Sequence, residues 1–156
     1  MDHKHYMKEA VTAALKGMQN NEGGPFGCVI VKDGKIIGKG NNKVTSTNDP
    51  TAHAEVTAIR DACKNLGSFQ LEGCTIYTSC EPCPMCLGAI YWARPEKVYY
   101  GSTKTDAAHI GFDDDFIYEE LKLPYADRSI PFEQLAPEVA IIPFQEWAVK
   151  EDKTEY

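Results

Sequence analysis

Apolar residues recur at helical spacing near the start of the chain and gather in strand-like runs after it. Between residues 5 and 18 they follow one face of a helix, which predicts an amphipathic helix. Two apolar runs within 28–37, joined by Asp33-Gly34, predict a β-hairpin with a tight turn. After a polar stretch, the pattern predicts a second amphipathic helix that ends at Gly67.

The middle of the chain has the pattern of a strand, a helix and a second strand. Residues 74–78 and 97–101 are rich in strand-forming side chains, and 84–94 predicts a helix closed by Pro95. A unit of this kind with short links is a right-handed crossover, so its two strands should be parallel. Helices on both sides of a mixed sheet make an α/β fold, and we expect a three-layer α/β/α sandwich.

The last part of the chain has weaker patterns. They predict a helix at 112–121, a strand at 132–136 and a short final helix at 144–150. No repeat or low-complexity segment divides the 156 residues, and we expect a single domain over residues 1–156.

Charge separates the beginning of the chain from its end. Residues 1–112 carry 12 basic and 11 acidic side chains, whereas residues 113–156 carry 4 basic and 12 acidic ones. An acidic surface of this kind argues against a nucleic-acid partner, which is bound mainly through Lys and Arg. The chain has no apolar run near the roughly 20 residues of a membrane span, so no membrane partner is expected. It also begins without the apolar segment of a signal peptide, which predicts cytoplasmic localisation with reduced thiols.

Two short motifs contain the residue types that bind a metal ion. Cys83 and Cys86 can reach one ion at the start of a helix, and His53 supplies a third donor. Three protein ligands leave the fourth tetrahedral position for water, as in catalytic zinc sites. Glu55 can face the same ion only if the ion lies off the N-terminal end of its helix. A carboxylate there can carry a proton from the attacking water to a departing amine.

The pattern His-x-Glu followed by Pro-Cys-x-x-Cys is the signature of zinc-dependent nucleobase deaminases. Two other interpretations exist for the cysteines. They could belong to a structural zinc site with Cys80 as a fourth ligand, or form a redox pair at the start of a helix. The nearby His-x-Glu favours the catalytic interpretation over both.

Through His53-Ala54-Glu55 and the segment 82–86, the chain resembles the cytidine-deaminase-fold superfamily. More narrowly, it resembles the small bacterial guanine deaminases over essentially its full length. The narrower likeness rests on several segments taken together, which are 23–27, 41–42, 49–55, 78–94, 111–114 and 155–156.

This resemblance implies hydrolysis of guanine to xanthine and ammonia, with one zinc ion in each subunit of a homodimer. His53, Cys83 and Cys86 would hold the zinc, and Glu55 would be the proton shuttle. The residues implied in substrate binding are Phe26, Asn42, Trp92, Asp114 and Tyr156.

Each of these substrate-binding residues has an implied role. Phe26 and Trp92 would pack on the purine, and Asn42 would bond a ring nitrogen or carbonyl. Asp114 would accept from a purine N–H or the amino group, because a carboxylate is an acceptor only. The C-terminal segment with Tyr156 would close a pocket, which could be that of the neighbouring subunit.

Simpler interpretations stay open for some of these residues and for the function. Asp114 could cap a helix, Phe26 and Trp92 could be core residues, and Tyr156 could be a frayed end. A tRNA adenosine deaminase shares the zinc motif, and another amino-substituted ring such as cytosine or a triazine is a further substrate class. A zinc-stabilised interaction module without enzymatic activity is the alternative of a different kind.

Overall fold

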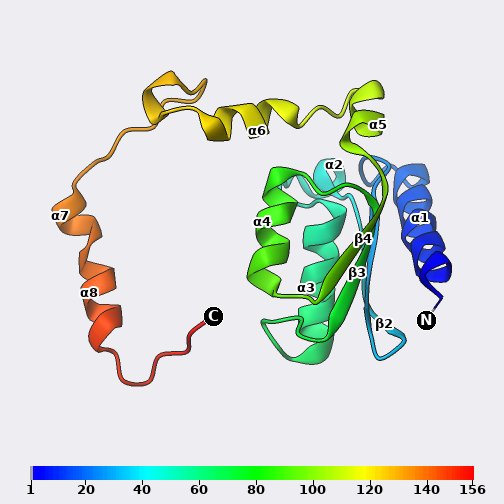
Figure 1. Ribbon diagram of the computed structural model, residues 1–156, viewed down its shortest axis with the longest axis horizontal. Coiled ribbons are helices and arrows are strands. Elements are labelled where there is room, and N and C mark those ends of the chain that lie inside the picture. Colours follow the sequence, from blue (N-terminus) through cyan, green and yellow to red (C-terminus); the bar gives the residue numbers. More distant parts are fainter. Residues whose placement is uncertain (1) are drawn as a thin grey trace. The chain divides into compact units, whose positions relative to one another are not determined.

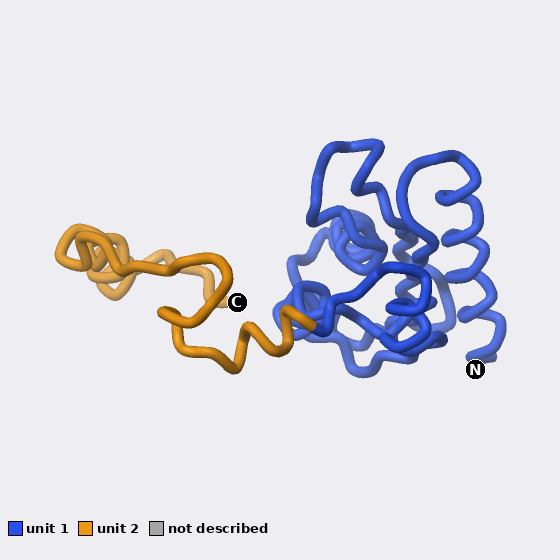
Figure 2. The backbone as a smooth tube through the Cα atoms, turned by 90° about the horizontal axis from the view of Figure 1, so that it is seen from above, with its two compact units in different colours: residues 1–115 blue, residues 116–156 orange. Residues whose placement is uncertain are grey.

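The computed structural model describes residues 2–156; Met1 lies outside the described part. The chain divides into two compact units, residues 1–115 and residues 116–156 (Figure 2). Each unit is described by itself, and the expectation of one domain over 1–156 stays a prediction.

Within its described residues, 2–115, the first unit contains five helices and four strands, and a sixth helix begins at its last residue. These elements are α1 (His3–Gln19), β1 (Gly27–Lys32), β2 (Lys35–Asn41), α2 (Val44–Thr47), α3 (Ala54–Leu66), β3 (Cys74–Cys80), α4 (Pro84–Ala93), β4 (Lys97–Ser102), α5 (Lys104–His109) and the first residue of α6 (Asp115–Lys122).

The strands form one mixed sheet in the order β2-β1-β3-β4. β1 is antiparallel to β2 and β3, and β4 is parallel to β3, which confirms the predicted hairpin and crossover. Asp33 and Gly34 both have positive φ, 49° and 74°, as a tight hairpin turn requires. Helix α1 covers one face of the sheet, and α3 with α4 covers the other (Figure 1). The expected three-layer α/β/α fold is confirmed.

Alternation along the strands separates two apolar cores, one on each face of the sheet. Val29, Val31 and Tyr77 pack with α1, whereas Cys28 and Ile76 pack with α3 and α4. Helix α3 contributes small side chains to this contact, which are Ala54, Ala58 and Ala62. Because these side chains are small, α3 packs close to the sheet, and this packing determines where the start of α3 lies.

Two short helices of the first unit, α2 and α5, have no counterpart among the predicted elements. Helix α5 has a readable signal, because Thr103 and Asp106 form a capping box at its start. The helix predicted at 112–121 begins only at Asp115, since residues 110–114 form a loop.

The second unit contains the rest of α6, a 3-10 turn at Tyr125–Asp127, α7 (Pro137–Ala140) and α8 (Ile142–Val149). The short final helix is thus confirmed, with its start at Ile142. The strand predicted at 132–136 is wrong, because this segment has no regular secondary structure. It has no neighbouring strand to pair with, and Ala136 lies in the left-handed region with φ 48° immediately before α7.

No residue within 116–156 is buried. Several large apolar side chains are instead well exposed in this unit, among them Leu135, Phe144 and Val149. No helix within residues 2–156 is both long enough and apolar enough to cross a membrane.

Candidate active site

Three side chains from two helices converge on one point. The Nδ1 atom of His53 lies 3.5 Å from the Sγ atoms of both Cys83 and Cys86. The three ligand atoms all lie within 4.8 Å of one another. Tetrahedral ligands at zinc distances of about 2.0–2.3 Å are themselves separated by roughly 3.5 Å. The donor set and its spacing therefore fit a zinc ion.

The starts of two helices position these donors. His53 is the N-cap residue of α3, with extended φ and ψ of −68° and 159°. Cys83 is the N-cap residue of α4, and its sulfur accepts the backbone N–H of Cys86 at 3.5 Å. Unpaired amides at a helix start favour negative charge, which here is thiolate. The two helix N-termini thus bring the three donors together as predicted, and their role as zinc ligands stays a prediction.

A hydrogen bond links the side chains of Cys83 and Cys86. A hydrogen bond from the Cys86 thiol lowers the pKa of Cys83 to about 4, and His53 and the Cys86 amide add to this effect. The same hydrogen bond, together with burial, raises the pKa of Cys86. The hydrogen bond to Cys83 also raises the pKa of His53, against the effect of burial. Because metal ligands must be deprotonated, zinc binding would release the proton that the Cys86 thiol donates.

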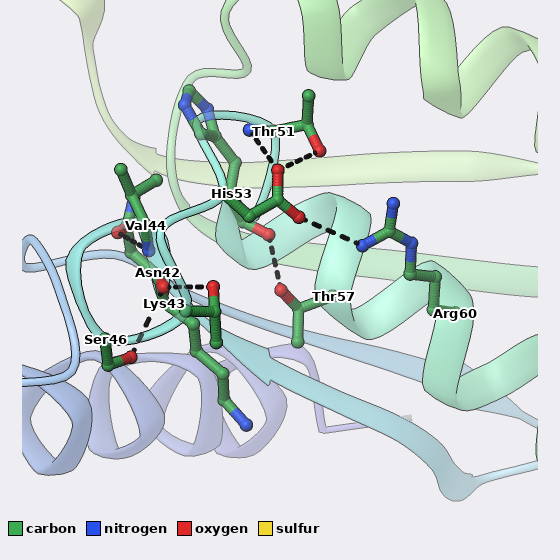
Figure 3. Close-up of polar contacts among 10 residues, drawn as sticks. Asn42, Lys43, Val44, Ser46, Thr51, His53, Thr57 and Arg60 are labelled. Atoms are coloured by element: carbon green, nitrogen blue, oxygen red, sulfur yellow. Dashed lines mark hydrogen bonds and ion pairs between the residues drawn. The ribbon is translucent and has the colours of Figure 1, made fainter.

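A polar turn orders the backbone that leads into His53. Asp49 accepts the backbone amide of Thr51 at 2.8 Å and its hydroxyl at 2.7 Å. Figure 3 shows this turn beside α3, where Arg60 pairs with Asp49 at 3.7 Å and the Thr57 hydroxyl donates to the His53 carbonyl at 2.8 Å. These contacts hold the His53 main chain from both sides.

Glu55 lies in the first turn of α3 and is only 6% exposed. The Thr78 hydroxyl donates to its Oε1 atom at 2.8 Å. Burial raises the pKa of Glu55, and the hydrogen bond from Thr78 opposes that effect. A carboxyl group whose pKa lies above the usual range is suited to accepting and returning a proton near neutral pH.

Cys80 does not join the three metal donors. Its sulfur lies 3.6 Å from the carbonyl oxygen of Thr103, and it is absent from the group of possible metal ligands among the described residues. Burial raises the pKa of Cys80 to about 11. A structural site with Cys80 as the fourth ligand is therefore disfavoured, and the fourth position stays available for water.

Asn42 follows β2 and is 6% exposed. Its Oδ1 atom accepts hydrogen bonds from the backbone N–H groups of Gly24 at 3.3 Å and Val44 at 3.1 Å, and its backbone N–H donates to the Phe26 carbonyl at 3.0 Å. Because the side-chain oxygen already accepts two backbone N–H groups, the side-chain amide nitrogen Nδ2 is the group that would meet a ligand.

An aromatic pair connects the loop before β1 with the loop that contains Asp114. The rings of Phe26 and Phe112 meet edge to face, with centroids 5.0 Å apart. Burial and the Cys83 charge raise the pKa of Asp114, and the charge of Asp114 adds a small upward effect to the pKa of His53. Asp114 is therefore within electrostatic range of His53 and Cys83. At the start of α6, the backbone N–H of Asp115 donates to Oδ1 of Asp113 at 2.9 Å.

Two of the predicted substrate residues are largely exposed side chains. Trp92 is in the last turn of α4 and is 62% exposed. Tyr156 is the last residue of the second unit and is 71% exposed. The roles of both residues stay predictions.

Two features of the site escaped the sequence analysis. Thr78 lies on the same face of β3 as Cys74, Ile76 and Cys80. A polar side chain on this otherwise apolar face could have indicated a functional role. Phe112 was noted only as part of a motif, and no local pattern pairs it with Phe26 across the chain.

Comparison with known proteins assigns the family. Residues 1–102 match the family model described as the cytidine and deoxycytidylate deaminase zinc-binding region. The chain belongs to this deaminase family. The matched region contains all three candidate ligands, so zinc is the cofactor of this family member.

Similar proteins extend the likeness beyond the family region. The guanine deaminase of Bacillus subtilis (strain 168) is 59% identical over 156 residues, which is 100% of both chains. The X-ray structure of guanine deaminase from Bacillus subtilis has a TM-score of 0.97 and covers 100% of this chain and 99% of that one. The tRNA-specific adenosine deaminase of Aquifex aeolicus (strain VF5) is 42% identical over 102 residues, 65% of this chain and 67% of that protein.

Proposed function

We propose that this protein hydrolyses guanine to xanthine and ammonia. The observation that carries the proposal is the 59% identity with the Bacillus subtilis guanine deaminase over the entire chain, including the acidic C-terminal unit. The likeness to a tRNA-specific adenosine deaminase covers only 65% of the chain. We therefore propose a small purine as the substrate and no nucleic-acid partner.

The candidate site accounts for the chemistry of this reaction. His53, Cys83 and Cys86 would hold the zinc ion, which would supply a Lewis acid that lowers the pKa of a water molecule. Glu55 accepts the proton that the attacking water loses and passes it to the amino group leaving from C2 of guanine. One water is consumed and one ammonia released, and Glu55 returns to its starting charge.

The neighbouring polar groups complement the edges of guanine. Guanine presents N–H donors at N1 and at the 2-amino group, and Asp114 offers only acceptors. The amide nitrogen of Asn42 would donate to a ring nitrogen or carbonyl, because its oxygen is used by backbone amides. Phe26 would pack on the ring, and Trp92 would extend this surface. A site with such hydrogen bonds rejects bases that cannot form them.

The direct test is to incubate the purified zinc-loaded protein with guanine, adenine, cytosine and tRNA. We expect ammonia release and the absorbance change to xanthine with guanine alone. Turnover of adenine or cytosine with inert guanine would contradict the assignment, and salt-sensitive deamination of tRNA would favour the alternative enzyme class.

Asp114→Asn is expected to lower kcat/KM for guanine by roughly 10²–10³-fold, because the amide presents an N–H where an acceptor is needed. Zinc content and melting temperature should stay unchanged. Asp113→Asn is the matched control, since Asp113 accepts the Asp115 amide at the start of α6. An equal loss of activity in both variants would instead support a helix-capping role.

We further propose that the protein is a homodimer in which the C-terminal segment with Tyr156 can close the pocket of the neighbouring subunit. The support is the absence of any buried residue in 116–156 and the exposure of its large apolar side chains, which a second copy would cover. The molar mass in solution tests the dimer. Six free cysteines support a reducing compartment, and we propose the cytoplasm.

A further inference from the structure

The carboxyl group of Glu55 is held by a hydroxyl from the centre of the sheet. Thr78 is 1% exposed, and its hydroxyl donates to Oε1 of Glu55 at 2.8 Å. In β3, Thr78 pairs with Cys28 of β1 on one side and with Tyr100 of β4 on the other. The main chain that carries the hydroxyl is thus fixed by two neighbouring strands.

The Thr78 hydroxyl can donate to Oε1 of Glu55 with or without bound metal. The neighbouring metal-binding cysteines cannot. A cysteine that binds zinc is a thiolate and has no proton to donate. Thr78 keeps its proton in either state, because a hydroxyl does not titrate in this range.

The terminal torsion of a glutamate side chain has broad, two-fold preferences, so an unrestrained carboxylate can present either oxygen to the metal site. The Thr78 hydroxyl has a single hydrogen and satisfies one oxygen, Oε1. This leaves Oε2 as the oxygen without this hydrogen bond.

We infer that Thr78 is a positioning residue for proton transfer, whose hydroxyl ties Oε1 of Glu55 so that Oε2 carries the proton. The inference rests on the proposed deaminase function. Oε2 accepts the proton that the attacking water loses and then gives it to the leaving amine. Oε1 accepts from Thr78 in both charge states of Glu55, and Thr78 itself neither gains nor loses a proton.

Thr78→Val removes the hydroxyl with little change in shape, and Thr78→Ser retains it. We expect kcat of the Val variant to fall by roughly 10–100-fold, the scale of a lost hydrogen bond to a charged group, with KM within about twofold. The Ser variant should recover kcat to within about threefold of the wild type. Thr75→Val is the matched control, because Thr75 lies in β3 on the opposite face from Thr78.

Two further measurements separate this role from general support of the fold. In a Glu55→Gln background, Thr78→Val should change the residual rate by less than about twofold, because Thr78 acts through Glu55. In metal-free protein with ¹³C-labelled glutamate carboxyl groups, the Glu55 signal is identified by its absence in Glu55→Gln. That signal should shift in Thr78→Val and stay in place in Thr78→Ser.

The inference is overturned by wild-type kcat in Thr78→Val, by equal losses in the Val and Ser variants, or by an equal loss in the Glu55→Gln background. If the Val variant loses zinc or fails to fold, the Ser variant decides. An unshifted Glu55 signal in Thr78→Ser without recovery of kcat would then overturn the inference, because the hydrogen bond would be present without its expected effect. The NMR measurement needs no substrate. If the wild type turns over another base instead of guanine, the same series is measured on that base, so failure of the substrate assignment is recognised separately.

Discussion

Glu55→Gln is expected to lower kcat by roughly 10⁴-fold, at the upper end for a general acid–base, because one side chain serves both proton transfers. Glutamine has nearly the same shape, and its Oε1 can still accept the Thr78 hydroxyl. It cannot take the proton that the attacking water loses. Zinc content should stay at one ion per chain, since Glu55 is outside the group of metal donors.

The measurement is steady-state ammonia release from guanine, with zinc determined by elemental analysis on the same samples. Glu72→Gln is the control, because Glu72 is exposed in the link before β3 and should leave kcat unchanged. Undiminished turnover in Glu55→Gln would remove Glu55 from the mechanism. It would favour an assignment of Glu55 as an ordinary buried carboxyl.

Cys86→Ser is expected to abolish both zinc retention and activity. Cys86 is fully buried, and among the described residues its sulfur is one of three protein donors in the candidate site. A serine hydroxyl stays protonated near neutral pH and is a poor zinc ligand. Changes in outer-shell partners already weaken metal binding by about 10–100-fold, so loss of a direct ligand should exceed that.

Zinc affinity is measured by competition with a chromogenic chelator, alongside the melting temperature of the metal-free and zinc-loaded forms. The wild type should gain thermal stability on adding zinc, because the ion binds only the folded state tightly. Cys63→Ser is the control, since Cys63 is in α3 outside the metal donors. Zinc binding of wild-type strength in Cys86→Ser would show that Cys86 is not a ligand.

Much of the first unit was predictable because its signals are local. The hairpin follows from Asp33-Gly34, whose backbone favours a tight turn, and the end of α3 follows from Gly67, which has the left-handed φ of 63°. The zinc donors were predictable for a similar reason. His53 and Cys83 each stand at a helix start that local start signals identify.

The C-terminal part was harder to predict, because its apolar residues lack a periodic context. The segment 132–136 has strand-like composition, yet a strand forms only where a neighbouring strand supplies hydrogen-bond partners. Partner strands are distant in the sequence, so composition alone cannot reveal their absence.

The amino-acid sequence by itself determined the elements of the sheet layers, the metal-binding residue types and the carboxyl group beside them, since each depends on neighbours a few positions away. Only the tertiary structure decided that Thr78 holds Oε1 of Glu55, that Phe112 packs on Phe26, and that Cys80 stays out of the metal site. These contacts join residues 23 to 86 positions apart in the chain, and such pairs are selected by how the sheet and helices pack.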